Sequence, residues 1–247
     1  MSYSYLSDIG RKRTMNQDYV KIFLNQQRLP LYLLADGMGG HQAGEVASKL
    51  TVETLGARFT KTEFQSIEEI GEWLTLEIKD LNHLVFEQGQ LDDFRSMGTT
   101  LEALLIFSNE LILAHVGDSR SYLLRNGDLT QLTEDHSLVN ELRLMGEITE
   151  EEAAHHPRKN IITRSIGMPK NVEVDLIRHK IADDDLVLIC SDGLFNMLEK
   201  AEIIAILAGD NTLDEKALQL VEQANANGGS DNISVLLIDG IKEEHHD

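Results

Sequence analysis

The chain has 247 residues, 42% of them apolar, and its 42 acidic against 22 basic side chains give a formal net charge of −20. This balance argues against nucleic acid as a partner, because affinity for nucleic acid rests mainly on basic contacts to phosphate. One cysteine, Cys190, excludes an intrachain disulfide, and without a signal peptide or an apolar run near the roughly 20 residues of a membrane span we expect a cytoplasmic protein with no membrane insertion.

The first half of the chain alternates short strands with one pair of helices. Apolar and β-branched runs predict strands at 2–7 (SYSYLS), 18–24 (DYVKIFL) and 29–35 (LPLYLLA). Helices are expected at 42–59 and 66–88. Further strands are expected at 99–107 (TTLEALLIF), 110–116 (ELILAHV) and 121–125 (SYLLR). Asn109 with Glu110 separates two of these runs, and Asn126–Gly127 after the last is a strong hairpin signal.

The pattern changes between residues 136 and 168. HSLVNELRLMG (136–146) predicts a short helix, the capping-box pattern from Thr149 to Glu152 opens a second, and Pro157 ends it. This segment is longer than an ordinary connection. We therefore expect a small insertion on the main body.

The last part of the chain returns to strands and helices. Strands are predicted at 171–177 (NVEVDLI), 185–190 (DLVLIC) and 232–238 (NISVLLI), and helices at 199–208 and 212–226. Thr212 is the expected N-cap of the last helix, with Glu215 three residues on. Strands in hairpin series with helices held apart indicate an antiparallel α+β architecture.

Aspartates recur at the ends of the predicted strands. They are Asp18, Asp36, Asp118, Asp192 and Asp231. Each alone is explained by turn chemistry, since Asp and Gly are common turn residues. Together they predict a carboxylate cluster at one end of a sandwich. Two like charges 4 Å apart repel by about 4 kcal/mol at an effective dielectric of 20, so such a cluster needs protonation or a bound cation.

The ligand types favour a hard cation. The sequence has no HExxH or CxxC pattern, which disfavours zinc, and carboxylates with a backbone carbonyl and water suit Mg²⁺ or Mn²⁺. Two such ions can activate a water for in-line attack on phosphorus. In the run DGMGG (36–40) we expect the backbone to approach the metals, with the Gly37 carbonyl as a ligand. The alternative is a glycine turn with left-handed backbone.

Eight motifs then occur in the order of a known family. They are RKRTMNQD (11–18), ADGMGGH (35–41), GTT (98–100), VGDSR (116–120), LTEDHS (132–137), ITRSIG (162–167), CSDGL (190–194) and GGSDNIS (228–234). On these motifs, which cover nearly the whole chain, it resembles the bacterial branch of the metal-dependent protein phosphatases, the PPM or protein phosphatase 2C family.

The resemblance implies a fold and an activity. The fold would be an α+β, four-layer arrangement in which a central antiparallel β-sandwich is flanked by helical layers. Residues 1–247 would form one phosphatase domain, with 136–168 as its flap beside the catalytic centre. The activity would be hydrolysis of phosphoserine and phosphothreonine in proteins at a centre of two Mn²⁺ or Mg²⁺ ions.

The resemblance also implies roles for residues. Asp36 would bridge two metals, Gly37 would supply its carbonyl, and Asp192 and Asp231 would complete the shell of the first metal. Asp118 and Asp192 would hold a third, weaker metal. Arg13 would bind substrate phosphate, a role that guanidinium geometry also favours; without the other motifs, a solvated basic run with Arg11 and Lys12 would explain it. Asp18 would lie in an outer shell and hold waters.

One departure from the family pattern concerns the proton donor. Some members carry a histidine two residues after the bridging aspartate, proposed as the general acid for the leaving alkoxide. Here that position is Met38, and His41 follows later. His41 either takes the acid role or is a loop histidine. We expect His136 to be structural, in a turn that opens a helix, and Cys190 to be a core residue.

Three functions remain open at this point. The leading one is a protein-serine/threonine phosphatase that opposes a eukaryotic-like Ser/Thr kinase and acts on that kinase's targets, as a monomer. The second is a phosphomonoesterase for small molecules. The third is a noncatalytic member that binds a phosphoprotein, against which the intact aspartate set and Arg13 argue.

Overall fold

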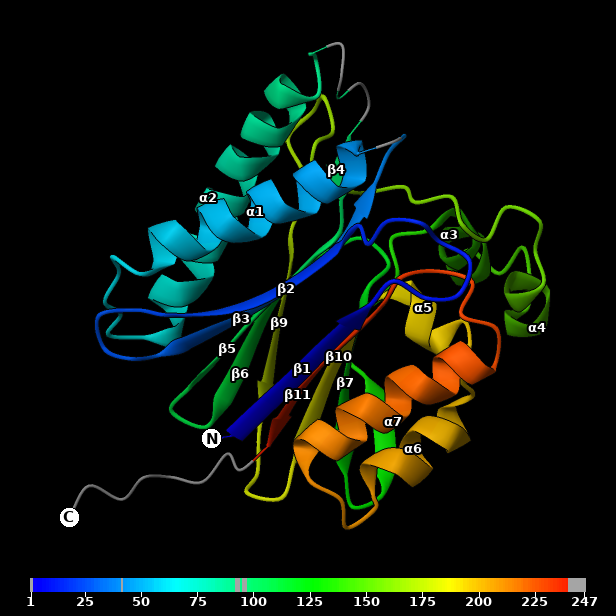
Figure 1. Cartoon of the computed structure of the whole chain (residues 1–247). Helices are drawn as coiled ribbons and strands as arrows, with labels where there is room; N and C mark the ends of the chain where they lie inside the picture. The colour runs from blue at the N-terminus through cyan, green and yellow to red at the C-terminus, as the bar shows by residue number, and fades with distance from the viewer. Residues whose placement is uncertain (1, 41, 92–93, 95–96, 240–247) are drawn as a thin grey trace.

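Two antiparallel sheets form the centre of the molecule (Figure 1). A computed structural model describes residues 2–40, 42–91, 94 and 97–239. The first sheet holds, in spatial order, β1 (Ser2–Asp8), β11 (Ile233–Asp239), β10 (Leu186–Cys190), β7 (Arg120–Arg125) and β8 (Asp128–Gln131). The second holds β2 (Asp18–Leu24), β3 (Pro30–Met38), β5 (Leu101–Phe107), β6 (Glu110–Val116) and β9 (Asp175–Lys180), with the short β4 (Gly98–Thr99) paired to β3.

Helices cover the outer face of each sheet. In Figure 1, α1 (Ala43–Phe59) and α2 (Ile67–Gln88) lie over the second sheet, and α6 (Lys200–Leu207) and α7 (Leu213–Ala226) lie over the first. Buried apolar side chains accordingly form three clusters, one under each helical layer and one between the sheets. This arrangement confirms the predicted α+β sandwich with flanking helices.

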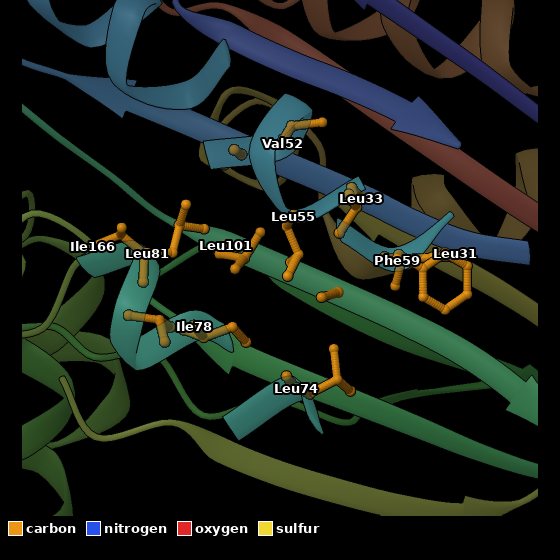
Figure 2. Packing of buried hydrophobic residues seen from close by; sticks show 14 of the residues in the cluster. Leu31, Leu33, Val52, Leu55, Phe59, Leu74, Ile78, Leu81, Leu101 and Ile166 are labelled. Atoms are coloured by element: carbon orange, nitrogen blue, oxygen red, sulfur yellow. The ribbon is translucent and has the colours of Figure 1, made fainter. Parts of the chain in front are cut away.

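The first part of strand β3, residues 30–35, is apolar without a break. Leu31 and Leu33 face the helices, and Figure 2 shows them beside Phe59 of α1. Tyr32 and Leu34 point the other way, into the core between the sheets. Successive strand residues alternate between faces, so a strand covered on both sides needs apolar residues at every position. Each buried leucine contributes about 1.5–3 kcal/mol.

Turns and caps follow the expected local chemistry, with one difference in a turn and a second difference in a strand boundary. Asn126 (φ 52°) and Gly127 (φ 81°) form the predicted two-residue turn between β7 and β8. Between β5 and β6 the turn is Ser108–Asn109, because Phe107 pairs with Glu110 in the ladder. The prediction of Asn109 with Glu110 was therefore wrong by one residue.

The second difference lies at β9, which begins at Asp175 and not at residue 171. Its partner β6 ends at Val116, and the ladder between them stops at the pair His115–Asp175. Val172 and Val174 still pack against the core under α1 and α2. The run NVEVDLI was apolar because of that packing and not because all of it is strand.

The segment 136–168 contains the two short helices expected from its sequence. Helix α3 (Leu138–Leu144) is capped by Ser137, and α4 (Glu150–Ala154) is opened by the capping box of Thr149 and Glu152. Isolated bridges Ser137–Ile162 and Thr99–Ile166 tie the segment to itself and to the second sheet. None of the helices in the described part of the chain is long and apolar enough to cross a membrane.

Candidate active site

Aspartates from both sheets surround one end of the sandwich. In the second sheet, Asp18 opens β2 and pairs in register with Asp36 of β3, while Asp118 lies in the turn from β6 to β7. In the first sheet, Asp192 follows β10 directly and opens the one-turn helix α5 (Asp192–Phe195), and Asp231 precedes β11. The charge of each of the other four raises the pKa of Asp36. The structure therefore brings all five predicted carboxylates into one electrostatic neighbourhood.

Burial and mutual repulsion raise the pKa of most of these carboxyl groups. Burial is the largest cause in each case and raises the pKa of Asp192 to about 8 and those of Asp18 and Asp118 to about 6. Asp36, which is partly exposed, has its pKa raised well above the ordinary value, first by desolvation and then by its four acidic neighbours. Such shifts mark sites where a counter-charge would be strongly favoured.

Two buried carboxylate oxygens lack a hydrogen-bond donor. They are Oδ1 of Asp18 and Oδ1 of Asp192. A buried acceptor left without a partner costs about 1–3 kcal/mol, so these atoms fit a cation or cation-bound water. Within the described ranges, however, no three His, Cys, Asp or Glu side chains converge closely enough to form a metal cage. The donor set therefore fits Mg²⁺-type binding, in which one or two carboxylates and several waters share the ion.

Arg13 lies at the edge of the cluster and pairs with one of its members. Its Nη2 donates to Oδ2 of Asp231 at 2.6 Å, with 48% of the Arg13 side chain exposed. That hydrogen bond is the first cause of the raised Arg13 pKa, and the charges of Asp192 and Asp36 also raise it. An exposed ion pair contributes only about 0–1 kcal/mol. The ion pair with Asp231 therefore keeps the Arg13 guanidinium beside the carboxylates but binds it only weakly.

Known proteins match this chain over nearly its whole length. The family model for "Protein phosphatase 2C" matches residues 10–232. The chain belongs to the protein phosphatase 2C family. It is 46% identical to a putative protein phosphatase 2C-type of Streptococcus pyogenes and 44% identical to protein phosphatase PhpP of Streptococcus pneumoniae, each over 244 residues and 99% of both chains.

Solved structures confirm the protein phosphatase 2C fold. The S. agalactiae serine/threonine phosphatase matches with a TM-score of 0.95 at 48% identity, over 96% of this chain and 98% of that one. The Mycobacterium tuberculosis serine/threonine phosphatase PstP/Ppp matches with a TM-score of 0.83 at 36% identity, over 96% and 97%. Metal dependence is general for the protein phosphatase 2C family.

The glycines of the protein phosphatase 2C motifs lie where two backbone segments approach each other closely. A Cβ on Gly37 would overlap the carbonyl oxygen of Gly44 at the start of α1, and it would lie 2.6 Å from the carbonyl oxygen of Gln17. A Cβ on Gly193 would likewise overlap the Asn232 carbonyl. Close approach of the backbone therefore excludes a side chain at both positions, and the Gly37 carbonyl as a metal ligand stays a prediction. Gly37 also lacks the positive φ of the turn alternative, which Gly39 has (φ 145°).

Buried hydroxyls fix the orientation of two aspartates. Ser191 Oγ donates to Oδ2 of Asp18 at 2.7 Å. The backbone N–H of Asp36 donates to Thr100 Oγ1 at 2.9 Å, and Thr100 in turn shares a 2.7 Å hydrogen bond with Ser119. Hydroxyl groups therefore hold one carboxylate oxygen of Asp18 and the backbone N–H of Asp36.

The predicted roles of the histidines and the cysteine divide three ways. His41 lies outside the described residues. His136 accepts the N–H of Gly117 at Nδ1 (2.9 Å) and donates its own backbone N–H to the Gly117 carbonyl (2.8 Å). Burial lowers the pKa of His136 to about 4, which keeps it neutral in a structural position, as expected. Cys190 is fully buried, which raises the pKa of its thiol, and it is a core residue.

A buried polar pair behind the site was missed by the sequence analysis. Glu102 on β5 and His115 on β6 are register partners and hydrogen-bond to each other with no exposed side-chain surface. Ser121 donates to the other Glu102 oxygen at 2.6 Å. The sequence did hold a signal for this pair, since each apolar run, TTLEALLIF and ELILAHV, contains one ionisable residue within it. Buried ionisable side chains are rarely left without a partner, so the glutamate and the histidine could have been expected to pair with each other.

A cleft of about 1000 Å³ adjoins two of the aspartates. Its lining includes Asp118 and Asp192, residues of α3 and α4 such as Arg143 and Ala153, and Phe195 of α5. The cleft thus separates the 136–168 segment from the helices that cover the first sheet. A ligand bound at Asp118 and Asp192 could therefore extend into the cleft.

Proposed function

We propose that this chain hydrolyses phosphoserine and phosphothreonine in proteins at a centre of two Mn²⁺ or Mg²⁺ ions. One observation supports this most: aspartates from both sheets share one electrostatic neighbourhood, and two of their buried oxygens lack donors. Family membership and the names of the relatives as serine/threonine phosphatases support the same reaction.

In this proposal the aspartates divide the work of holding the ions. Asp36 would bridge them, the Gly37 carbonyl would add a ligand, and Asp192 and Asp231 would complete one shell. Asp118, with Asp192, would hold a third and weaker ion. Asp18, fixed by Ser191, would orient water in the outer shell. The ions, when bound, supply an activated water for in-line attack on phosphorus.

Arg13 and His41 would handle the substrate and the leaving group. Arg13 exchanges its weak pair with Asp231 for phosphate oxygens, in both ground and transition states, so Arg13→Ala should mainly raise KM. His41 would protonate the leaving alkoxide. His41→Ala should then slow phosphopeptide hydrolysis by about 10²-fold and leave p-nitrophenyl phosphate nearly unaffected, because p-nitrophenolate leaves without a proton. Equal slowing of both substrates, or of neither, would remove His41 from this role.

The segment 136–168 would act as a flap that selects protein substrates. The cleft beside it, continuous with the aspartates, has room for residues that flank a phosphorylated side chain. We further propose that the protein is a cytoplasmic monomer and opposes a eukaryotic-like Ser/Thr kinase by acting on that kinase and its targets. Phosphoproteomics of a deletion strain against wild type tests these partners, and an unchanged phosphoproteome would contradict them.

The substrate class is tested by a direct comparison. The full chain with Mn²⁺ is assayed on a phosphothreonine peptide and on a panel of small phosphomonoesters. We expect a higher kcat/KM on the peptide. A preference for one small ester over every peptide would show a small-molecule phosphomonoesterase. Binding of phosphopeptide without turnover would show a noncatalytic member.

A further inference from the structure

Arg120 joins three separate elements beside the aspartates. It lies at the start of β7, two residues after Asp118. Its Nε and Nη2 donate to Oδ1 and Oδ2 of Asp135 at 2.8 and 2.7 Å. Its guanidinium carbon lies 3.7 Å from the ring centroid of Phe195, and Nη1 donates to the Tyr122 hydroxyl at 3.2 Å. These contacts with Asp135, Phe195 and Tyr122 together fix the orientation of the Arg120 side chain.

Two partners of Arg120, Phe195 and Asp135, are close in the chain to residues that position the aspartates. Phe195 lies three residues after Asp192, at the end of the same helical turn, α5. Asp135 directly precedes His136, whose ring and backbone both bond to Gly117, the residue before Asp118. Arg120 thus links the turn with Asp118, the root of the 136–168 segment and the helix that begins at Asp192.

The contacts made by Arg120 depend on a planar fork. A guanidinium can bind a carboxylate through two parallel hydrogen bonds while its flat face lies on an aromatic ring. A lysine ammonium keeps the charge but reproduces neither the double hydrogen bond nor the stacking. Replacement by lysine therefore removes the geometric constraint and leaves the charge near Asp118 in place.

We propose that Arg120 is a positioning residue that fixes Asp118 relative to Asp192 through Asp135 and Phe195, and thereby sets the affinity of this pair for a divalent cation. The inference rests on the proposed metal centre. Groups that orient metal ligands without touching the ion commonly change metal affinity by about 10–100-fold when they are replaced.

The same strand supplies a matched control. Arg125, at the other end of β7, binds Asp185 with the same fork, Nε to Oδ1 at 2.7 Å and Nη2 to Oδ2 at 2.6 Å. Asp185 lies at the opposite end of β10 from Asp192. Arg125→Lys therefore breaks an equivalent ion pair on the same strand without loosening the aspartates.

The test measures Mn²⁺ binding to the metal-stripped full chain by calorimetry, with thermal unfolding of each apoprotein beside it. We expect Arg120→Lys to weaken the lowest-affinity Mn²⁺ binding step by about 10-fold or more, and Arg125→Lys to leave every step unchanged at a similar loss of Tm. Phe195→Leu keeps the Asp135 fork and removes the ring, and it should weaken the same step. It decides the matter if Arg120→Lys does not fold.

Two results would overturn the inference. The first is wild-type Mn²⁺ affinity in Arg120→Lys, or in Phe195→Leu where only that variant folds. The second is an equal loss in Arg120→Lys and Arg125→Lys, which would mean general loosening of the strand. If the wild-type chain itself bound no Mn²⁺, the proposed metal centre would fail and this inference with it. Failure of the inference alone is therefore distinguishable.

Discussion

Asp36 combines a backbone fixed by hydrogen bonds with a carboxyl group repelled by its neighbours. Its backbone is fixed by Thr100, which donates its N–H to the Asp36 carbonyl and accepts the Asp36 N–H at its hydroxyl, both at 2.9 Å. Its carboxyl group lies near four other acids, and desolvation and their charges raise its pKa. A fixed and repelled carboxylate gains nothing for the fold of the metal-free chain. Protonation or a bound cation would relieve this repulsion.

Replacing Asp36 should therefore abolish activity without unfolding the protein. We expect Asp36→Ala and Asp192→Ala each to lower kcat on a phosphothreonine peptide by on the order of a thousandfold, the scale of losing several kcal/mol of transition-state stabilisation. Circular dichroism and the Tm of the apoprotein check the fold, which should be retained. A near-wild-type rate for Asp36→Ala would refute its bridging role.

At the scale of elements, local chemistry was predictable and its tertiary consequences were not. Asn126–Gly127 and the capping box of Thr212 and Glu215 act within a few residues, so the sequence shows them directly. The Ser108–Asn109 turn depends on the register between β5 and β6. Helix α5 is a single turn whose only sequence signal was the motif CSDGL. These features require a partner that lies elsewhere in the chain.

Exposed side chains of the 136–168 segment should affect protein substrates more than small ones. Lys159 and His155 are exposed and line the cleft beside the aspartates. Their replacement by alanine should change kcat/KM on phosphoproteins more than on p-nitrophenyl phosphate, because the small substrate needs only the ions and Arg13.

Lys61→Ala provides the matched control for these variants, since Lys61 is equally exposed but lies after α1 and outside the cleft lining. It should change neither rate. Equal effects of Lys159→Ala on both substrates would mean that the segment supports the site and does not select proteins.

At the scale of the molecule, the sandwich itself assembles the site. Asp192 and Asp231 adjoin strands of one sheet, Asp18 and Asp36 belong to the other, and Asp118 lies in the turn that joins the two sheets, so neither sheet alone holds the cluster. Because these aspartates lie at the ends of predicted strands, the sequence was enough to predict that they would lie close together. The pairing of Arg13 with Asp231 and the polar support behind Asp36 were not predictable, because they depend on how the two sheets face each other.

The raised pKa values predict how stability depends on pH without metal. An acid with a higher pKa in the folded state holds its proton more tightly there, so stability falls as pH rises through that pKa. Asp192, with a pKa of about 8, and Asp36 act in this direction. His136, with a pKa of about 4, acts oppositely only below its unfolded value of about 6.5.

In excess chelator, Tm should therefore decrease from about pH 6.5 to pH 9, and Mn²⁺ should remove the trend. Asp192→Asn should flatten it, while Asp239→Asn, at the far end of β11, should not. Scanning fluorimetry across this range is the measurement. A Tm that rises with pH in the metal-free wild type would contradict the clustering of repelled carboxyl groups.

We propose that these carboxylates hold the ions on which hydrolysis of phosphothreonine by this chain depends. The most direct measurement follows phosphate release from a phosphothreonine peptide by the metal-stripped chain while Mn²⁺ is titrated in. We expect no turnover in excess chelator and a return of turnover that saturates with Mn²⁺. Undiminished turnover in excess chelator would contradict it.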